Sequence, residues 1–296
     1  MPLKSLTALI ALVIVAGCQD ADRTTGQTVV LPKVTVMTEE VSIKLGEMGP
    51  DFANRYPGKV RVTHSTPGVD SYQIDWERPR GAVKLDHGIH SLVIVDVLSV
   101  QAPQELRELT SEGMNTFDVY AGMSVLDPGL VSHDEARLKT YAILQRILDT
   151  GWQQVIERSE PRLKGKQRQD YTFATSNLNG LDATYMPTLE EWMRIASRTP
   201  WSFYADGLYM DVSFTRERTL SDPTKPGSYL LTFNIKTETE YLRGFAGPDN
   251  RLRWKELLPR ELAKVATLRA QKETELRATG VQIDESYRDP PLPALK

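Results

Sequence analysis

The residue whose chemistry is easiest to name is Cys18, the single cysteine among 296 residues. Lys4 lies near the start of the chain, an apolar run from Leu6 to Ala16 follows, and Gly17 leads directly into the cysteine. A positive residue, a short apolar run and small residues before a cleavage point are the layout of a secretory signal. Because a membrane-spanning helix needs about 20 apolar residues, this run is too short to cross a membrane.

The four residues Val15-Ala16-Gly17-Cys18 resemble the lipobox of bacterial lipoproteins. The resemblance implies that a peptidase removes residues 1–17 as a signal peptide. It also implies that the Cys18 sulfur carries a diacylglyceryl group and that the new amine is acylated. Gln19 stands where an aspartate tends to hold Gram-negative lipoproteins at the inner membrane, so an outer-membrane anchor facing the periplasm is implied. An ordinary cleaved signal with an incidental cysteine, or a buried amino-terminal helix, are the alternatives.

His87 and His90 are a second candidate for chemistry, because two imidazoles three residues apart can share a metal ion on a helix. Gly88 between them, and the apolar run that follows, favour a turn instead. Asp86 would have to complete the ligand set, since the only cysteine is assigned to the anchor. We therefore predict no metal site. His133 is isolated at the start of a predicted helix, and we expect its side chain to be solvated.

Nucleophilic catalysis needs a hydroxyl or thiol beside a base and an orienting acid. The chain contains no Gly-x-Ser-x-Gly turn, no phosphate-binding loop and no dinucleotide fingerprint. Glu190 and Glu191 are adjacent, so their carboxylates point to different sides of a helix, and Glu191 has the capping-box spacing from Thr188. We predict a protein that is not an enzyme, with no catalytic residue and no cofactor.

Composition and charge restrict the function further. Hydrophobic residues make up 40% of the chain and charged residues 25%, which is typical of a folded protein. The net charge of −3 argues against a nucleic-acid partner. One cysteine cannot form an internal disulfide, so a packed core must supply the stability. Residues 18–28 are mostly small and polar, and we predict a flexible tether between the lipid anchor and the fold.

Short runs rich in β-branched residues predict a sheet. Asp206-Gly207 between two alternating runs is the strongest hairpin signal, since both residue types tolerate the positive φ of a tight turn. Ser91–Val100 is apolar at nearly every position, and we expect a central strand that is covered on both faces. The predicted strands are Val29–Met37, Val60–His64, Ser71–Trp76, Ser91–Val100, Trp152–Ile156, Trp201–Ala205, Leu208–Thr215 and Ser228–Lys236.

Apolar periodicity of 3.6 residues predicts three helices. They are Asp134–Asp149, Thr188–Ser197 and Lys255–Thr279. Ser132 and Glu135 have the spacing of a capping box before the first. Glu160–Tyr171 is charged and contains proline and glycine, so we expect an exposed loop there. The order of elements predicts an α+β fold with a mostly antiparallel sheet and three helices. It forms either one domain or two α+β lobes, residues 29–160 and residues 161–296, the second containing the long terminal helix.

Three features carry a resemblance to a functional family. They are the lipobox at residues 15–18, the Asp206-Gly207 hairpin after Pro200-Trp201, and the end of the chain from Glu275 to Pro291. The chain resembles the periplasmic immunity lipoproteins encoded beside type VI secretion effectors, particularly those that guard against phospholipase toxins. The resemblance implies a membrane-anchored protein that holds a toxic effector in a stoichiometric complex and blocks its active site.

Two other functions are alternatives to this hypothesis. One is an envelope assembly or structural lipoprotein that binds another outer-membrane component, and the other is a periplasmic hydrolase with an unrecognised site. Because aromatic and arginine side chains dominate binding hot spots, Trp76–Arg80 and the basic stretch Lys164–Lys166 are the most interface-like segments. Solvated turns are the alternative for both segments.

Overall fold

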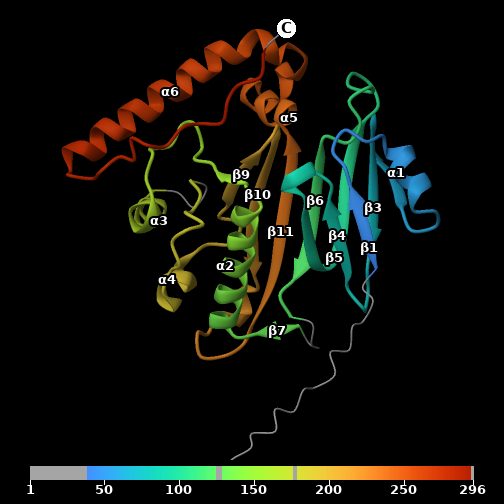
Figure 1. Ribbon diagram of the computed structural model, residues 1–296, viewed down its shortest axis with the longest axis horizontal. Coiled ribbons are helices and arrows are strands. Elements are labelled where there is room, and N and C mark those ends of the chain that lie inside the picture. Colours follow the sequence, from blue (N-terminus) through green and yellow to red (C-terminus); the bar gives the residue numbers. More distant parts are fainter. Residues whose placement is uncertain (1–38, 125–128, 176–178, 295–296) are drawn as a thin grey trace, which may run out of the picture. The chain divides into compact units, whose positions relative to one another are not determined.

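An eleven-stranded sheet organises the computed structural model, which describes residues 39–124, 129–175 and 179–294 (Figure 1). Its strands pair antiparallel, except that β1 and β4 are parallel. Along the main path they lie in the order β1 (Glu40–Ile43), β4 (Gly81–Leu85), β5 (Leu92–Glu105), β6 (Thr116–Gly122), β11 (Gly227–Thr237), β10 (Leu208–Arg216), β9 (Trp201–Ala205) and β8 (Gln153–Gln154). Off this path, β2 (Arg61–Thr66) pairs with β3 (Val69–Asp75), β3 pairs with β5, and β7 (Leu130–Val131) pairs with β11. The predicted α+β class with a mostly antiparallel sheet is confirmed.

Six α-helices lie in the described residues, so the prediction of three helices is wrong. The three that periodicity predicted are α2 (His133–Asp149), α4 (Leu189–Arg194) and α6 (Trp254–Ala278). The three that it missed are α1 (Gly49–Arg55), α3 (Gly165–Ala174) and α5 (Glu238–Arg243). Helices α1 and α5 have seven and six residues, too few to repeat an apolar stripe. The short 3₁₀ helices are η1 (Gly88–His90), η2 (Arg218–Leu220), η3 (Gly244–Ala246) and η4 (Pro248–Arg253).

Helix α3 occupies most of the stretch for which an exposed loop was predicted, and that prediction is wrong. Its buried residues are Arg168, Gln169 and Thr172, so a polar face points into the protein. Thr172 Oγ1 donates to the Gly180 carbonyl at 2.9 Å, and Arg168 Nη2 donates to the Val155 carbonyl at 3.2 Å. A helix whose inward face is polar has no apolar periodicity to detect.

The predicted Asp206-Gly207 hairpin is confirmed between β9 and β10. Ala205 pairs with Leu208 across the turn, and both central residues have positive φ, 36° for Asp206 and 84° for Gly207. Aspartate and glycine are among the residues that adopt this conformation at little cost. The flanking strands alternate as predicted, with Trp201, Phe203 and Ala205 buried on β9.

Strand β5 is 14 residues long and changes neighbours near Asp96, which has a φ of 57°. Before the bend it pairs with β4, and after it residues 99–105 pair with β3 while residues 97–101 pair with β6. Registers shift on both sides of the bend, as expected for a β-bulge. The first half is not covered on both faces, so that prediction is wrong. Leu92 and Ile94 are buried, whereas Val93 and Val95 are each 46% exposed.

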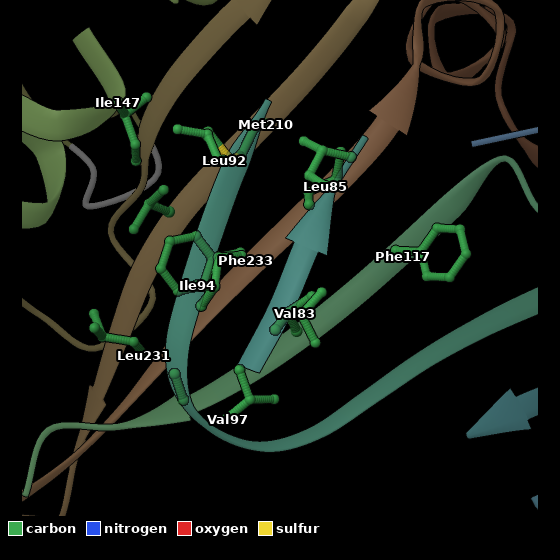
Figure 2. Close-up of a cluster of buried hydrophobic side chains, with 14 of the residues drawn as sticks. Val83, Leu85, Leu92, Ile94, Val97, Phe117, Ile147, Met210, Leu231 and Phe233 are labelled. Atoms are coloured by element: carbon green, nitrogen blue, oxygen red, sulfur yellow. The ribbon is translucent and has the colours of Figure 1, made fainter. Parts of the chain in front are cut away.

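One apolar core connects α2 with strands from both sides of residue 160. Figure 2 shows Ile147 of α2 near Leu92 of β5 and Met210 of β10, with Ile94 close to Phe233 of β11. Strand β6 pairs with β11 through seven residues, which joins the earlier strands to the later ones in a single sheet. The described residues belong to one compact unit.

Helix α6 has 25 residues but buries only Trp254, Leu258 and Glu273. The first two join a small second core with Leu242. Within the described ranges, no helix combines the length and the apolar character needed to cross a membrane. Cys18 and the predicted strand Val29–Met37 lie outside the described residues.

Candidate functional site

An apolar groove with a volume of about 580 Å³ lies between α2 and the first half of β5. Small-molecule and peptide-sized sites in proteins are commonly hollows of about 300–1,000 Å³ with mostly apolar walls. One wall is Ser91–Asp96 of β5, and the other is a face of α2. Leu231 and Phe233 of β11, with the end of β6 at Gly122, line the groove between the two walls. We call this site the β5–α2 groove.

The α2 wall follows from helical geometry. The side chains that line it are Lys139, Ala142, Ile143, Arg146, Ile147 and Thr150. Their spacing of three and four residues places them in one stripe along the helix. Ser132 starts the helix by accepting a hydrogen bond from the Glu135 main-chain N–H at 3.1 Å. Leu144 and Tyr141 point into the core, so the groove stripe is the flank of a firmly packed helix.

The β5 wall combines buried and exposed apolar side chains. Leu92 and Ile94 point into the core, where Figure 2 shows them beside Ile147 and Phe233. Val93 and Val95 alternate with them and are about half exposed. A strand that presents two adjacent exposed valines beside an open groove is an apolar surface of the kind that binding partners cover.

The main-chain groups of Val93 point away from β4. Ala82 N–H donates to the Glu39 carbonyl and Asp86 N–H donates to the Ile43 carbonyl, so the even-numbered residues of β4 face β1. The odd-numbered residues therefore face β5, and the register pairs Val83 with Ile94 and Leu85 with Leu92.

Leu92 and Ile94 consequently direct their N–H and C=O groups toward β4, and Val93 between them directs its groups to the opposite edge. Strand β6 pairs with β5 only from Val97 onward. In the parts of the chain that the structure describes, no strand pairs with this edge at Leu92–Asp96. We call it the free edge of β5.

Cationic side chains flank the groove. Lys139 Nζ lies 2.7 Å from Glu135 Oε1 and donates to the Met123 carbonyl at 3.1 Å. Arg146 is exposed in the last turn of α2, and among the described residues it forms no ion pair. Asp96 is the acidic residue of the groove lining.

A second hollow of about 390 Å³ shares Gly122 and Met123 with the groove and is lined by Arg78 and Arg80. Glu217 is the acidic residue in that lining. The interface-like segment Trp76–Arg80 therefore lies next to the groove, although Trp76 itself is buried. The basic stretch Lys164–Lys166 lies elsewhere, at the start of α3.

The groove has the composition of a binding site. Its hydroxyl groups are engaged by the main chain, because Ser91 Oγ donates to the Gly88 carbonyl at 2.8 Å and Thr150 Oγ1 donates to the Ile147 carbonyl at 2.9 Å. What the groove offers a ligand is apolar area, unpaired main-chain groups and positive charge at its rim.

The histidines considered as metal ligands are held by main-chain carbonyls. His87 Nε2 lies 2.9 Å from the Ala205 carbonyl, and His90 Nδ1 lies 2.7 Å from the Thr150 carbonyl. His90 Nε2 also lies 3.3 Å from Asp206, a contact that nothing in the sequence indicated. Asp86 pairs instead with Ser42 and Lys84, and the Ser42 hydrogen bond lowers the pKa of its carboxyl most. No group of three histidine, cysteine or acidic residues in the described ranges could hold a metal ion.

Glu191, one of the two adjacent glutamates, belongs to the cap of α4. Glu191 accepts from the Thr188 main-chain N–H at 2.8 Å while Thr188 Oγ1 accepts from the Glu191 N–H, so the predicted capping box is confirmed. The hydrogen bond from Thr188 is the main reason why the pKa of Glu191 is lowered. Lys166 Nζ lies 3.3 Å from the same carboxylate.

His133 is 1% exposed, so the prediction of a solvated side chain is wrong. The Tyr229 hydroxyl donates to His133 Nδ1, and His133 Nε2 donates to the Asp222 carbonyl at 3.1 Å. Trp192 Nε1 and Arg216 Nε donate to the same hydroxyl at 3.1 and 3.0 Å. Burial lowers the pKa of His133 and keeps the ring neutral. The Tyr229 ring packs edge-on against His133 and also lies beside Trp192, so the cluster has a structural role.

Comparisons of the chain with protein-family models, with curated proteins and with solved structures return no match.

Proposed function

We propose that this chain is a lipid-anchored protein of the bacterial periplasm that captures another protein in the β5–α2 groove. The observation that carries the proposal is the groove itself, with two exposed valines on one wall and the Ala142–Ile143 stripe on the other. Each square ångström of apolar surface that a partner removes from water contributes about 25 cal/mol. A standard protein interface is larger than the groove, so the groove would hold the central anchor of the complex.

The partner that we propose is a toxic effector of a type VI secretion system, such as a phospholipase, whose active site the complex blocks. The support comes from the lipobox at residues 15–18 and from the resemblance to immunity lipoproteins in the second half of the chain. An anchor in the outer membrane would keep the protein at the surface that such a toxin attacks. Tethering raises the effective concentration of one partner beside the other without any new contact.

The test compares two tryptophan substitutions on the same helix. Ala142→Trp fills the groove, whereas Leu138→Trp changes a 48% exposed residue of α2 outside the groove lining. In a strain that lacks the chromosomal copy, the parent chain and the Leu138 variant should restore resistance to killing by sister cells. The Ala142 variant should leave the strain sensitive, and thermal unfolding should show that both variants fold.

Two results would contradict the proposal. If the deletion strain resists killing as well as its parent, the chain is not an immunity protein. If both variants protect equally, the groove is not the capture site. A lipid extracted from the parent chain but not from the Ala142 variant would assign the groove to an amphiphile and would also overturn capture of a protein.

A further inference from the structure

We infer that the partner enters the β5–α2 groove as an extended segment that pairs with the free edge of β5 and carries acidic side chains to Arg146 and Lys139. This inference rests on the proposed function, because it names how the captured protein is recognised. Strand addition to an exposed sheet edge is a recurring way of binding peptides, in which main-chain hydrogen bonds supply affinity and alternate side chains supply specificity.

The free edge has the polarity and spacing that strand addition requires. Val93 presents both its N–H and its C=O on the side away from β4, as the hydrogen bonds of Ala82 and Asp86 establish. Leu92–Asp96 would match about five residues of an added strand, roughly 17 Å of extended chain. The bulge at Asp96 ends this edge, since from Val97 onward β6 occupies the position.

From Leu92 to Val95 the free edge also lacks three devices that keep sheet edges from pairing. Exposed edges are commonly protected by lysine, by proline or by inward-pointing charges. Here the edge carries Val93 and Val95, both 46% exposed, and β-branched side chains favour strand pairing. By contrast, Glu39 and Lys59 form an ion pair beside the start of β1, at the opposite border of this part of the sheet.

An extended segment fits these groups better than a helix does. A helix satisfies its own main-chain groups, so it would remove the Val93 N–H and C=O from water without pairing them. An unpaired main-chain group loses its hydrogen bonds to water and weakens the complex. A strand pairs both groups and directs alternate side chains toward Ile143 of α2.

Charge complementarity selects acidic residues in the segment. Arg146 and Lys139 lie on the α2 rim, and Arg78 and Arg80 line the adjoining hollow. Arg146 forms no ion pair among the described residues, Lys139 already pairs with Glu135, and Asp96 is the acidic residue of the groove lining. Acidic side chains at the ends of the segment would therefore meet positive charge on both sides of the apolar centre.

The experiment selects peptides on the full chain reconstituted in lipid vesicles. A displayed pool of random peptides of about nine residues is enriched on the parent chain and depleted on the Ala142→Trp variant. We expect β-branched residues at alternate positions with Asp or Glu beyond them. An Arg146→Glu variant should weaken the selected peptides, and Arg260→Glu, an exposed site on α6, should not.

Each amide of the best peptide is then methylated in turn. Strand pairing predicts a period of two, in which methylation of inward amides weakens binding about tenfold, the loss of one main-chain hydrogen bond, and methylation of outward amides does not. Three results would overturn the inference. The first is methylation that weakens binding without a period of two, the second is a set of selected peptides that share a helical spacing of residues, and the third is a selection in which no peptide distinguishes the parent from the Ala142 variant. Binding only after deletion of residues 29–37 would assign the edge to the chain's own segment and would also overturn it.

The two proposals can fail separately. If the Ala142 variant loses protection while the methylation pattern has no period, capture in the groove stands and strand addition falls. If peptides pair with the edge but the Ala142 variant still protects, the edge binds strands and capture of the toxin in the groove falls.

Discussion

Helices α2 and α6 are attached to the protein by different forces. Helix α2 has 17 residues and buries six of them, including Ala136, Tyr141, Leu144 and Ile147 in the main core. Helix α6 has 25 residues and buries three. The second half of α6 is held by charged groups, since Glu273 binds Arg162 and Arg269 binds Asp289 of the carboxyl-terminal segment.

The difference teaches where the protein can form a rigid site. Apolar packing fixes α2 without requiring its outer flank, so the groove stripe is free to meet a partner. Helix α6 uses its charged residues to hold itself in place. The contrast makes distinct predictions for the two helices.

The largest effect is expected in the core of α2. Leu144→Ala removes a fully buried side chain and leaves a cavity, so the free energy of unfolding should fall by about 3 kcal/mol. Leu138→Ala on the exposed side of the same helix should change it by less than about 0.5 kcal/mol. Urea unfolding of both variants measures the difference, and equal losses would show that α2 is not held by its apolar face.

A smaller and more local effect is expected in α6. Glu273 is 3% exposed and accepts hydrogen bonds from Arg162 N, Nε and Nη2 at 3.1, 2.7 and 2.7 Å. Glu273→Gln leaves Arg162 with the exposed Glu285 as its nearest counter-charge and should cost about 2 kcal/mol, less than a fully buried pair because Arg162 is partly exposed. Hydrogen exchange should accelerate in the second half of α6 while α2 stays protected.

Glu275→Gln is the matched control, since Glu275 is an exposed residue of the same helix that accepts a hydrogen bond from Gln271 Nε2 at 3.0 Å. It should leave the exchange of α6 unchanged. A similar acceleration in both variants would mean that the ion pairs around Arg162 do not hold the helix.

The smallest effect is a pH dependence that originates in the His133 cluster at the start of α2. Burial lowers the pKa of His133 below its ordinary value of 6.5, with Arg216 acting in the same direction and Asp222 opposing both. As the pH falls through 6.5, the unfolded chain binds a proton that the folded chain does not, so stability decreases from pH 7 toward pH 5. In His133→Gln this decrease should be shallower. Thermal unfolding across that range measures the two slopes, and identical slopes would contradict the assignment.

Helix caps and tight turns were predicted from the sequence, because neighbouring residues determine them. Ser132 and Thr188 begin helices as predicted, and Asp206-Gly207 forms its hairpin, because each depends on residues within a few positions. Helix α3 escaped prediction because Arg168 and Gln169 face inward, so its buried face is polar and has no apolar period.

The groove depended on facts that no local pattern contains. An apolar run such as residues 91–100 fits two kinds of strand equally well. One is covered on both faces, and the other pairs with its neighbouring strand along only half of its length. Two signals pointed to the groove in retrospect, the aspartate at position 96 inside that run and the breadth of the apolar face of α2. The apolar face of α2 includes Ala142 and Ile143 as well as Leu144. The sheet buries Leu144 but leaves Ala142 exposed, so part of this apolar face remains uncovered.

The bend at Asp96 restricts how this protein can evolve. With a φ of 57°, the position accepts aspartate, asparagine or glycine far more readily than a β-branched residue. A valine there would favour an extended β5 that continues beside β6 and closes the free edge. Lineages that retain the captured partner should therefore vary Val93 and Val95 as the partner changes while keeping one of three residue types at 96, and loss of that restriction would mark descendants in which the groove has been abandoned.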